Sequence, residues 1–380
     1  MSIDCDANAT YLPEAELQGV IAACLKHLGN PSSLHRGGQR ARAALEEARA
    51  LVRETLGASS GDSVVFTSGA TEANNMVVNA CARLGARKLV ASAIEHPCVL
   101  EPLSMAGAHA GADVVLVAPG TGGIVSCAGM AAALTEDTTL VSVMAANNET
   151  GVVNPVAEIA RTARSRSPQV LTHTDAAQVP GKGELSFRDL GVDFMTVSGH
   201  KFGAPSGIGA LLIRHGIGIS PLILGGPQEA KLRAGTENVF GAAAMAGVLS
   251  RVGSGLASRI GAMRGARDHF ERLVRQCVPG VIFNGEEHPR LPNTSSVCIP
   301  GVRGDDLVVA LDLEGVLASS GAACSSGKPG PSHVLRAMGQ PLERVKSTIR
   351  ISFRADVRLG DVERVVAALA RVLGRMNRGS

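Results

Sequence analysis

The chain has 380 residues and a formal net charge of +3, from 37 basic and 34 acidic residues scattered along the sequence. Because no long basic run occurs and aromatic residues make up only 2%, we expect no surface for direct nucleic-acid binding. No apolar stretch approaches the ~18 residues of a membrane span, and the N-terminus lacks the pattern of a secretory signal. We therefore expect a globular cytoplasmic protein without a membrane segment.

Predicted strands alternate with predicted helices up to about residue 215. The apolar runs of strand length are 63–69, 88–96, 113–119, 139–148, 170–178, 193–201 and 209–215. Helical patterns cover 71–84, 129–134 and 156–165. This alternation predicts an α/β fold, with a mostly parallel sheet of seven-stranded type between helices. Ligands bind at the carboxyl ends of the strands in such sheets, so the residues after each strand are candidates for the chemistry.

The pattern changes near residue 245. A long helical stretch over about 245–277 leads into short strands and a final amphipathic helix, which predicts a smaller α+β domain. We assign residues 15–250 to the large domain, and residues 1–14 and 251–380 to the small one. Residues 321–332 are rich in Gly, Ser and Pro and are expected to form a mobile loop.

The cysteines are dispersed over the whole chain, and no CxxC pair occurs, so neither a zinc site nor a redox dithiol is predicted. The eight cysteines are Cys5, Cys24, Cys81, Cys98, Cys127, Cys277, Cys298 and Cys324. This usage favours a reducing compartment, in which most cysteines are small buried residues. A reactive role for Cys324, which lies in the predicted loop, therefore needs support from its context.

Three predicted strand ends carry groups that suit one kind of cofactor. Lys201 follows a strand on a Gly turn and could form a Schiff base with an aldehyde, although a surface lysine would look similar. Asp175 ends a buried strand, where a protonated pyridine nitrogen would offset its charge; an N-cap aspartate is the simpler alternative. The turn at 68–72 resembles a phosphate cradle or an ordinary helix cap. Together the three indicate pyridoxal 5'-phosphate (PLP) more strongly than any one alone.

Longer segments match a known family in order along the chain. They are 6–10, 30–42, 66–75, 94–100, 147–155, 173–178, 198–211, 233–238, 319–327, 331–339 and 347–352. On these segments the chain resembles the NifS-like cysteine desulfurases, of the class V aminotransferase group of fold-type I PLP enzymes. The resemblance runs over nearly the whole length. It implies a large PLP-binding domain and a smaller C-terminal domain that carries a catalytic-cysteine loop.

The resemblance implies a role for each residue around the cofactor ring. Lys201 would be the Schiff-base lysine and would shuttle the Cα proton, and Asp175 would pair with the pyridinium nitrogen. Gln178 would donate a hydrogen bond to the ring hydroxyl, with Asn148 near that hydroxyl and the substrate. His96 would stack over the ring and act in acid–base chemistry.

A second set of residues is implied for the phosphate. Thr71, Ser198 and His200 resemble its ligands, and Ala70 lies in the same turn as Thr71. Thr236 resembles a residue that reaches the phosphate of the other subunit, which implies a homodimer.

The remaining implied residues act on the substrate. Arg350 resembles the guanidinium clamp for the carboxylate of L-cysteine. Cys324 resembles the nucleophile that takes the substrate sulfur as a persulfide while alanine is released. An acceptor protein, such as an iron–sulfur scaffold, would then receive the sulfur. No metal site is implied.

The sequence departs from the family pattern at a few positions. Pro227 and Lys231 stand where glycine is usual, Ser206 replaces a frequent lysine, and Arg354 replaces a common glycine. Two alternatives therefore stay open. One is a different PLP reaction on the same scaffold, such as selenocysteine cleavage or transamination. The other is a non-catalytic protein of the PLP fold that serves as an assembly partner.

Overall fold

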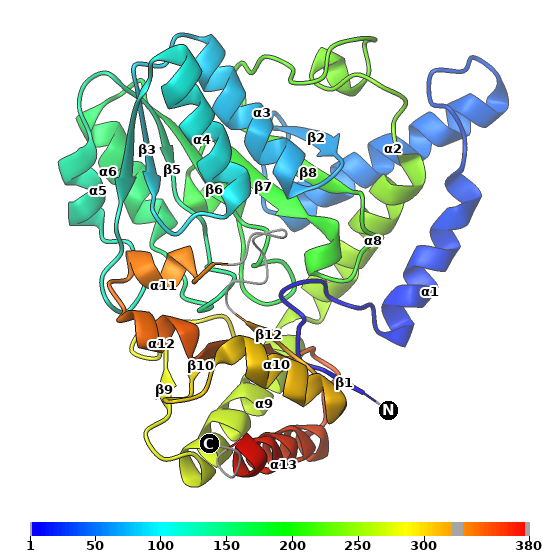
Figure 1. Ribbon diagram of the computed structural model, residues 1–380. Helices are drawn as coiled ribbons and strands as arrows, with labels where there is room; N and C mark the ends of the chain where they lie inside the picture. The colour runs from blue at the N-terminus through cyan, green and yellow to red at the C-terminus, as the bar shows by residue number, and fades with distance from the viewer. Residues whose placement is uncertain (1, 321–329, 377–380) are drawn as a thin grey trace.

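The computed structural model describes residues 2–320 and 330–376. Figure 1 shows two packed units, with a large sheet and its helices above a smaller unit formed mainly by the C-terminal third of the chain. The N-terminal strand lies against the smaller unit.

A seven-stranded sheet forms the centre of the large unit. Its strands are β2 (Ser63–Thr67), β3 (Lys88–Ser92), β4 (Asp113–Val117), β5 (Thr138–Ser142), β6 (Leu171–Asp175), β7 (Phe194–Ser198) and β8 (Gly209–Ile213). Their order across the sheet is β2-β8-β7-β6-β5-β3-β4. Only β8 runs antiparallel to its neighbours, and the other neighbouring pairs in this sheet are parallel. The predicted mostly parallel α/β fold is confirmed.

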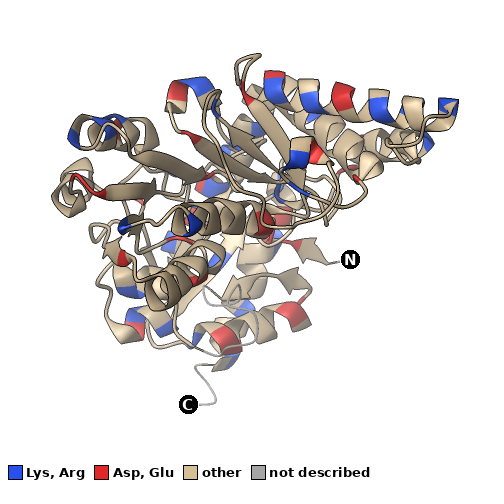
Figure 2. Ribbon diagram, turned by 90° about the horizontal axis from the view of Figure 1, so that it is seen from above, with Lys and Arg blue, Asp and Glu red and all other residues tan. Residues whose placement is uncertain are grey.

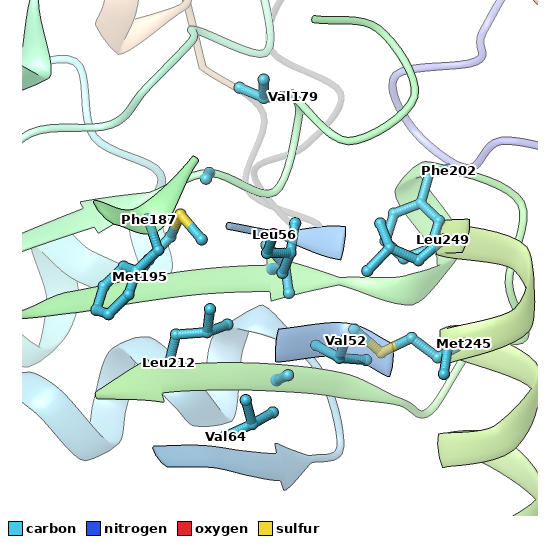
Figure 3. Packing of buried hydrophobic residues seen from close by; sticks show 14 of the residues in the cluster. Val52, Leu56, Val64, Val179, Phe187, Met195, Phe202, Leu212, Met245 and Leu249 are labelled. Atoms are coloured by element: carbon cyan, nitrogen blue, oxygen red, sulfur yellow. The ribbon is translucent and has the colours of Figure 1, made fainter. Parts of the chain in front are cut away.

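Helices cover both faces of this sheet. They are α1 (Ala15–Ala23), the 3-10 helix η1 (Cys24–His27), α2 (Arg36–Thr55), α3 (Ala70–Arg83), α4 (Pro97–Ala110), α5 (Cys127–Ala133), α6 (Val156–Arg166), α7 (Phe187–Leu190) and α8 (Val239–Ser254). Strand β8 shows why two layers are needed. Leu212 belongs to one buried cluster with Val52 of α2 and Met245 of α8 (Figure 3), whereas Leu211 belongs to a second cluster with Val77 and Leu103 on the opposite face. Apolar side chains on both faces require cover on both faces.

The smaller unit packs helices against an antiparallel sheet. Its elements are α9 (Leu256–Cys277), β9 (Ile282–Phe283), β10 (Thr294–Cys298), α10 (Gly304–Leu313), β11 (Val316–Leu317), β12 (Ser319–Ser320), α11 (His333–Ala337), α12 (Leu342–Lys346), β13 (Thr348–Ser352) and α13 (Leu359–Met376). The order in the four-stranded sheet is β12-β13-β10-β9. Strand β1 (Ile3–Asp4) pairs in parallel with β11. Whether the domains divide at residues 14 and 250 stays a prediction.

The predicted single helical stretch over 245–277 is wrong in one respect. The chain breaks at Gly255 between α8 and α9, which meet at a bend of 75°. Glycine has the lowest helix propensity after proline, and no side chain at this position favours continuation of the helix. The bend directs α9 away from the large sheet and into the small unit.

Acidic and basic residues are mixed on the helices seen from above the large sheet (Figure 2). Figure 2 shows Lys and Arg interspersed with Asp and Glu over the outer helices, including α2. Among the described residues, no single helix is long and apolar enough to cross a membrane; only the bent pair α8 and α9 passes when the two are taken together.

Candidate active site

A cavity of about 420 Å³ opens at the carboxyl ends of β6 and β7, beside the start of α3. Predicted site residues that line it are Ala70, Thr71, His96, Asn148, Asp175, Gln178, Ser198, His200 and Lys201. These residues come from separate strand ends and turns, as the position rule for parallel sheets predicts. The roles that the resemblance gives them stay predictions.

The turn that begins α3 lies close to β8. Gly69 caps α3 with φ +157°, and a Cβ on Gly209 would lie only 2.7 Å from the Cα of Gly69. Glycine at 209 therefore allows the turn to pack directly against the strand. The turn directs the N-terminus of α3, with Ala70 and Thr71, into the cavity. The backbone N–H groups of a helix N-terminus favour an anion such as a phosphate.

Asp175 ends β6 and is only 7% exposed. Its Oδ2 accepts a hydrogen bond from Asn74 Nδ2 at 2.6 Å, and its Oδ1 accepts one from the Ala177 N–H at 2.9 Å. Both donors are neutral, and no ion pair to Asp175 occurs in residues 2–320 or 330–376. A buried carboxylate that faces a cavity and has no ion-pair partner among the described residues is suited to a positively charged ligand group. The protonated ring nitrogen of PLP is such a group, so this end of the cavity fits the cofactor.

Lys201 ends the 3-10 helix η2 (Gly199–Lys201), which follows β7 directly. Its Nζ donates to the carbonyl oxygens of Asn8 and Ala9, each at 2.9 Å. The amine therefore lies at the cavity wall, where the N-terminal segment of the chain crosses the end of the sheet. This is the placement that a Schiff-base lysine needs.

Two histidines line the cavity in their neutral forms near pH 7. Burial, aided by the charge of Lys201, lowers the pKa of His200 to about 4, and its Nδ1 lies 3.1 Å from Thr10 Oγ1. Burial also lowers the pKa of His96, with the positive charge of Lys201 acting in the same direction and Asp175 opposing it. His96 caps α4, and its Nδ1 accepts from the Cys98 N–H at 3.2 Å. The neutral imidazole of His96 therefore carries its proton on Nε2.

Gln178 is held by residues that the sequence did not single out. Its Nε2 donates to the Asn8 carbonyl at 3.0 Å, and its Oε1 accepts from Lys182 Nζ at 2.8 Å. Asn8 also donates through Nδ2 to the Asn148 carbonyl at 3.2 Å. The only sequence signals were the position of Asn8 within a matching segment and that of Lys182 four residues after Gln178.

Arg350 does not line the cavity. It lies on β13, is 1% exposed, and donates to the Asn148 carbonyl at 3.1 Å and to Asp6 Oδ1 at 2.6 Å. The guanidinium is thus next to the cavity wall, behind Asn148, where a carboxylate already occupies part of its donor fork.

One further predicted residue is not brought to the cavity, and another cannot be placed. Thr236 is exposed, between η3 (Glu229–Lys231) and α8, and is not among the lining residues. Cys324 lies outside the described residues. Within residues 2–320 and 330–376, no group of His, Cys, Asp or Glu could hold a metal ion.

The departures from the family pattern have local structural consequences. Lys231 adopts φ +68° and follows Glu229 and Ala230, which also have positive φ. Glycine is favoured in this conformation, so the lysine is strained where the pattern has glycine. The turn is anchored by Glu229, which accepts from Arg49 at 2.7 Å and from the Phe66 N–H at 2.9 Å.

Two other departures differ in their relation to the cavity. Arg354 pairs with Asp356 at 2.5 Å and lies outside the cavity lining. Ser206, by contrast, lines the cavity.

Comparisons with known proteins agree with this geometry. The model of the aminotransferase class-V family matches residues 5–365. The chain is 38% identical to "Cysteine desulfurase IscS" of Dictyoglomus turgidum, covering 98% of this chain and 94% of that protein. A solved "NifS-like protein" superposes with a TM-score of 0.92 at 32% identity, covering 98% of this chain and 100% of that one. The structure of "SspA in complex with cysteine" superposes with a TM-score of 0.80 at 28% identity, covering 93% and 99%.

The match spans nearly the full length of both partners in each comparison. The chain therefore belongs to the aminotransferase class-V family, within its NifS-like cysteine desulfurases. Enzymes of this family depend on PLP.

Proposed function

We propose that the chain uses PLP to remove sulfur from L-cysteine, releases L-alanine, and passes the sulfur from Cys324 to an acceptor protein. The observation that carries this proposal is the cavity in which the carboxylate of Asp175 and the amine of Lys201 face the same space beside a helix N-terminus. Membership of the cysteine desulfurases names the reaction. In this account the acceptor is a cytoplasmic protein, such as an iron–sulfur scaffold.

The cavity residues would hold each part of the cofactor. Asp175 would bind the ring nitrogen, Gln178 the ring hydroxyl, and Lys201 the aldehyde carbon. The helix N-terminus at Thr71, together with Ser198, would bind the phosphate. When bound, PLP supplies an electron sink that stabilises negative charge on the substrate Cα.

The protein's own groups move protons and orient the substrate. Lys201 Nζ, held by two carbonyls, would take the Cα proton of bound L-cysteine and return it to the carbon skeleton. His96, as the neutral Nε2–H form, would donate a hydrogen bond into the cavity. Arg350 would bind the substrate carboxylate by exchanging its contact with Asp6 for the new anion.

Cys324 would take the sulfur. Its thiolate attacks the substrate sulfur, so an S–S bond forms while the Cβ–S bond breaks. The carbon skeleton keeps the electron pair of the broken bond, gains a proton and leaves as alanine. The product on the protein is a persulfide, which a second thiol in the acceptor can remove.

The proposal includes a homodimer. Thr236 is exposed on the segment between η3 and α8, which leaves its hydroxyl available to the phosphate site of a second copy. A dimer would therefore complete two sites at once, with each copy contributing one ligand to the other.

Incubation of the PLP-loaded protein with L-cysteine tests the proposed reaction. We expect a visible absorption band from the bound cofactor, and stoichiometric release of alanine and sulfide when a thiol reductant is present. A protein that shows the band but releases no alanine would contradict the assignment of L-cysteine as substrate. A protein without the band would contradict the assignment of the cofactor.

A further inference from the structure

Lys182 is a buried basic residue to which the mechanism above gives no task. Its side chain is 1% exposed, and the charged groups that face it are the basic residues Lys201, Arg350 and Arg259. No ion pair to Lys182 occurs within residues 2–320 and 330–376. Burial of an amine without an anionic partner lowers the stability of the fold. A role in the neighbouring site would explain why the lysine is there.

Both hydrogen bonds of Lys182 go to side chains that shape the cofactor cavity. Its Nζ donates to Gln178 Oε1 at 2.8 Å and to Asn8 Oδ1 at 3.2 Å. Burial, with Lys201 acting in the same direction, lowers the pKa of Lys182 well below its ordinary value. A neutral amine still has two hydrogens, and two acceptors receive them.

These contacts decide which way the amide of Gln178 points. Lys182 takes Oε1 as an acceptor, and the Asn8 carbonyl, which can only accept, takes one hydrogen of Nε2 at 3.0 Å. Reversal of the amide would place Oε1 against the Asn8 carbonyl oxygen, and one hydrogen of the Lys182 amine would lose its acceptor. Among the described residues, the second hydrogen of Nε2 has no partner, and Gln178 lines the cavity.

The same lysine fixes Asn8, which joins the two units. Asn8 Oδ1 also accepts from Asn293 Nδ2 at 2.9 Å, and Asn8 Nδ2 donates to Thr294 Oγ1 at 2.8 Å in β10. The carbonyl of Asn8 then accepts from Lys201 Nζ at 2.9 Å. A lysine behind the cavity wall is thus connected through one residue to the reactive amine.

We propose that Lys182 is a positioning residue that directs the Nε2–H of Gln178 into the cavity, toward the ring hydroxyl oxygen of bound PLP. The proposal rests on the cofactor assignment made above and concerns the same site. It does not require Lys182 to touch the cofactor or the substrate.

Substitution Lys182→Met tests this role, because methionine fills a similar volume but donates no hydrogen bond. Without the hydrogen bond from Gln178, the ring hydroxyl oxygen of bound PLP becomes more basic. The proton that this oxygen shares with the Lys201 nitrogen is then held more tightly. We expect the midpoint of the pH titration of the visible cofactor band to rise by roughly one pH unit. PLP affinity should fall roughly tenfold.

The control is Arg290→Met, which removes another buried cation, paired with Glu271 at 2.8 Å in the small unit. That variant should lose thermal stability without any change in the titration midpoint. Lys182→Gln, which keeps one amide donor, should shift the midpoint less than Lys182→Met, and it serves if the methionine variant does not fold.

A double substitution identifies the route of the effect. On a Gln178→Leu background, Lys182→Met should add no further shift, because the residue through which it acts is gone. A full additional shift, or an unmoved midpoint in Lys182→Met alone, would overturn this inference and leave the proposed function intact. A wild-type protein without a cofactor band would overturn the proposed function first and this inference with it.

Discussion

The two sides of the cavity are built in different ways. On the sheet side, Asp175, Ser198 and Lys201 lie at or just after the ends of adjacent strands, and the backbone ladder between β6 and β7 fixes their spacing. On the opposite side, Asn8 contacts Lys182 and Thr294, which are 174 and 286 residues away in sequence. The sheet sets the backbone positions of the first side, whereas the second side exists only when the two units and the N-terminus have docked.

The two sides of the cavity are expected to have different tasks, cofactor chemistry on one side and substrate binding on the other. The groups that would act on the cofactor lie on the sheet side, although Lys201 and Gln178 also donate to the Asn8 carbonyl. The carboxylate clamp, Arg350, belongs to the docked side and depends on Asp6 and Asn148 for its position. Substitutions on the two sides should therefore fail in distinguishable ways.

The largest effect is expected on the sheet side. Lys201→Ala should remove the covalent attachment of PLP and lower alanine formation by at least about 1,000-fold, because a nucleophilic amine and a proton carrier are lost together. Alanine release and the visible band are the measurements. Lys26→Ala, on the exposed surface of η1, is the matched control and should retain both. Normal turnover in Lys201→Ala would break the assignment of this side.

A smaller effect on a different parameter is expected on the docked side. Arg350→Lys keeps the charge but loses the two-pronged contact, so kcat/KM for L-cysteine should fall about 10- to 100-fold through KM. The visible cofactor band should stay, because the sheet side is untouched. Arg354→Lys, in the outer ion pair with Asp356, should leave KM unchanged. A loss of the band in Arg350→Lys, with KM unchanged, would mean that the two sides are not separable.

A third prediction concerns the pH dependence of stability, to which the buried Glu149 contributes. Burial raises the pKa of Glu149 to about 7, although Ser332 and Arg350 act to lower it. Between the unfolded value near 4.5 and this value the folded state keeps a proton that the unfolded state has lost. The contribution of Glu149 to stability therefore falls as pH rises through this window and is level above it.

The isosteric Glu149→Gln removes this dependence while keeping an acceptor for Ser332. The free energy of unfolding of Glu149→Gln, relative to that of wild type, should be greater at pH 8 than at pH 5 by on the order of 3 kcal/mol. Thermal melts at the two pH values measure the gain. An equal difference in Tm at both values would show that Glu149 does not titrate in this window.

The sheet side of the cavity could be predicted from the sequence, whereas the contacts on the docked side could not. Asp175 and Lys201 were found because each lies beside its own strand, so local order along the chain already gives their place. Asn8 and Lys182 were not assigned, because hydrogen bonds between distant segments leave no period or spacing in the sequence. The direction of β8 was also not readable, since buried parallel and antiparallel strands share the same apolar run.

The smallest expected effect lies away from both sides, at the strained turn. Lys231→Gly should stabilise the protein by up to about 1 kcal/mol, because φ +68° suits glycine better than lysine. Lys231→Ala keeps the strain and should bring no gain, which makes it the matched control. Equal melting temperatures in wild type and Lys231→Gly would mean that the anchored Glu229 turn absorbs the strain elsewhere.

The most direct test of the whole account is a mass spectrum of the PLP-loaded protein after brief incubation with L-cysteine. The account predicts one added sulfur atom on the peptide that contains Cys324, with alanine released. Both should be absent in Cys324→Ala and retained in Cys277→Ala, which removes an exposed thiol elsewhere. Bound PLP without sulfur on Cys324, or sulfur and alanine that persist in Cys324→Ala, would contradict it.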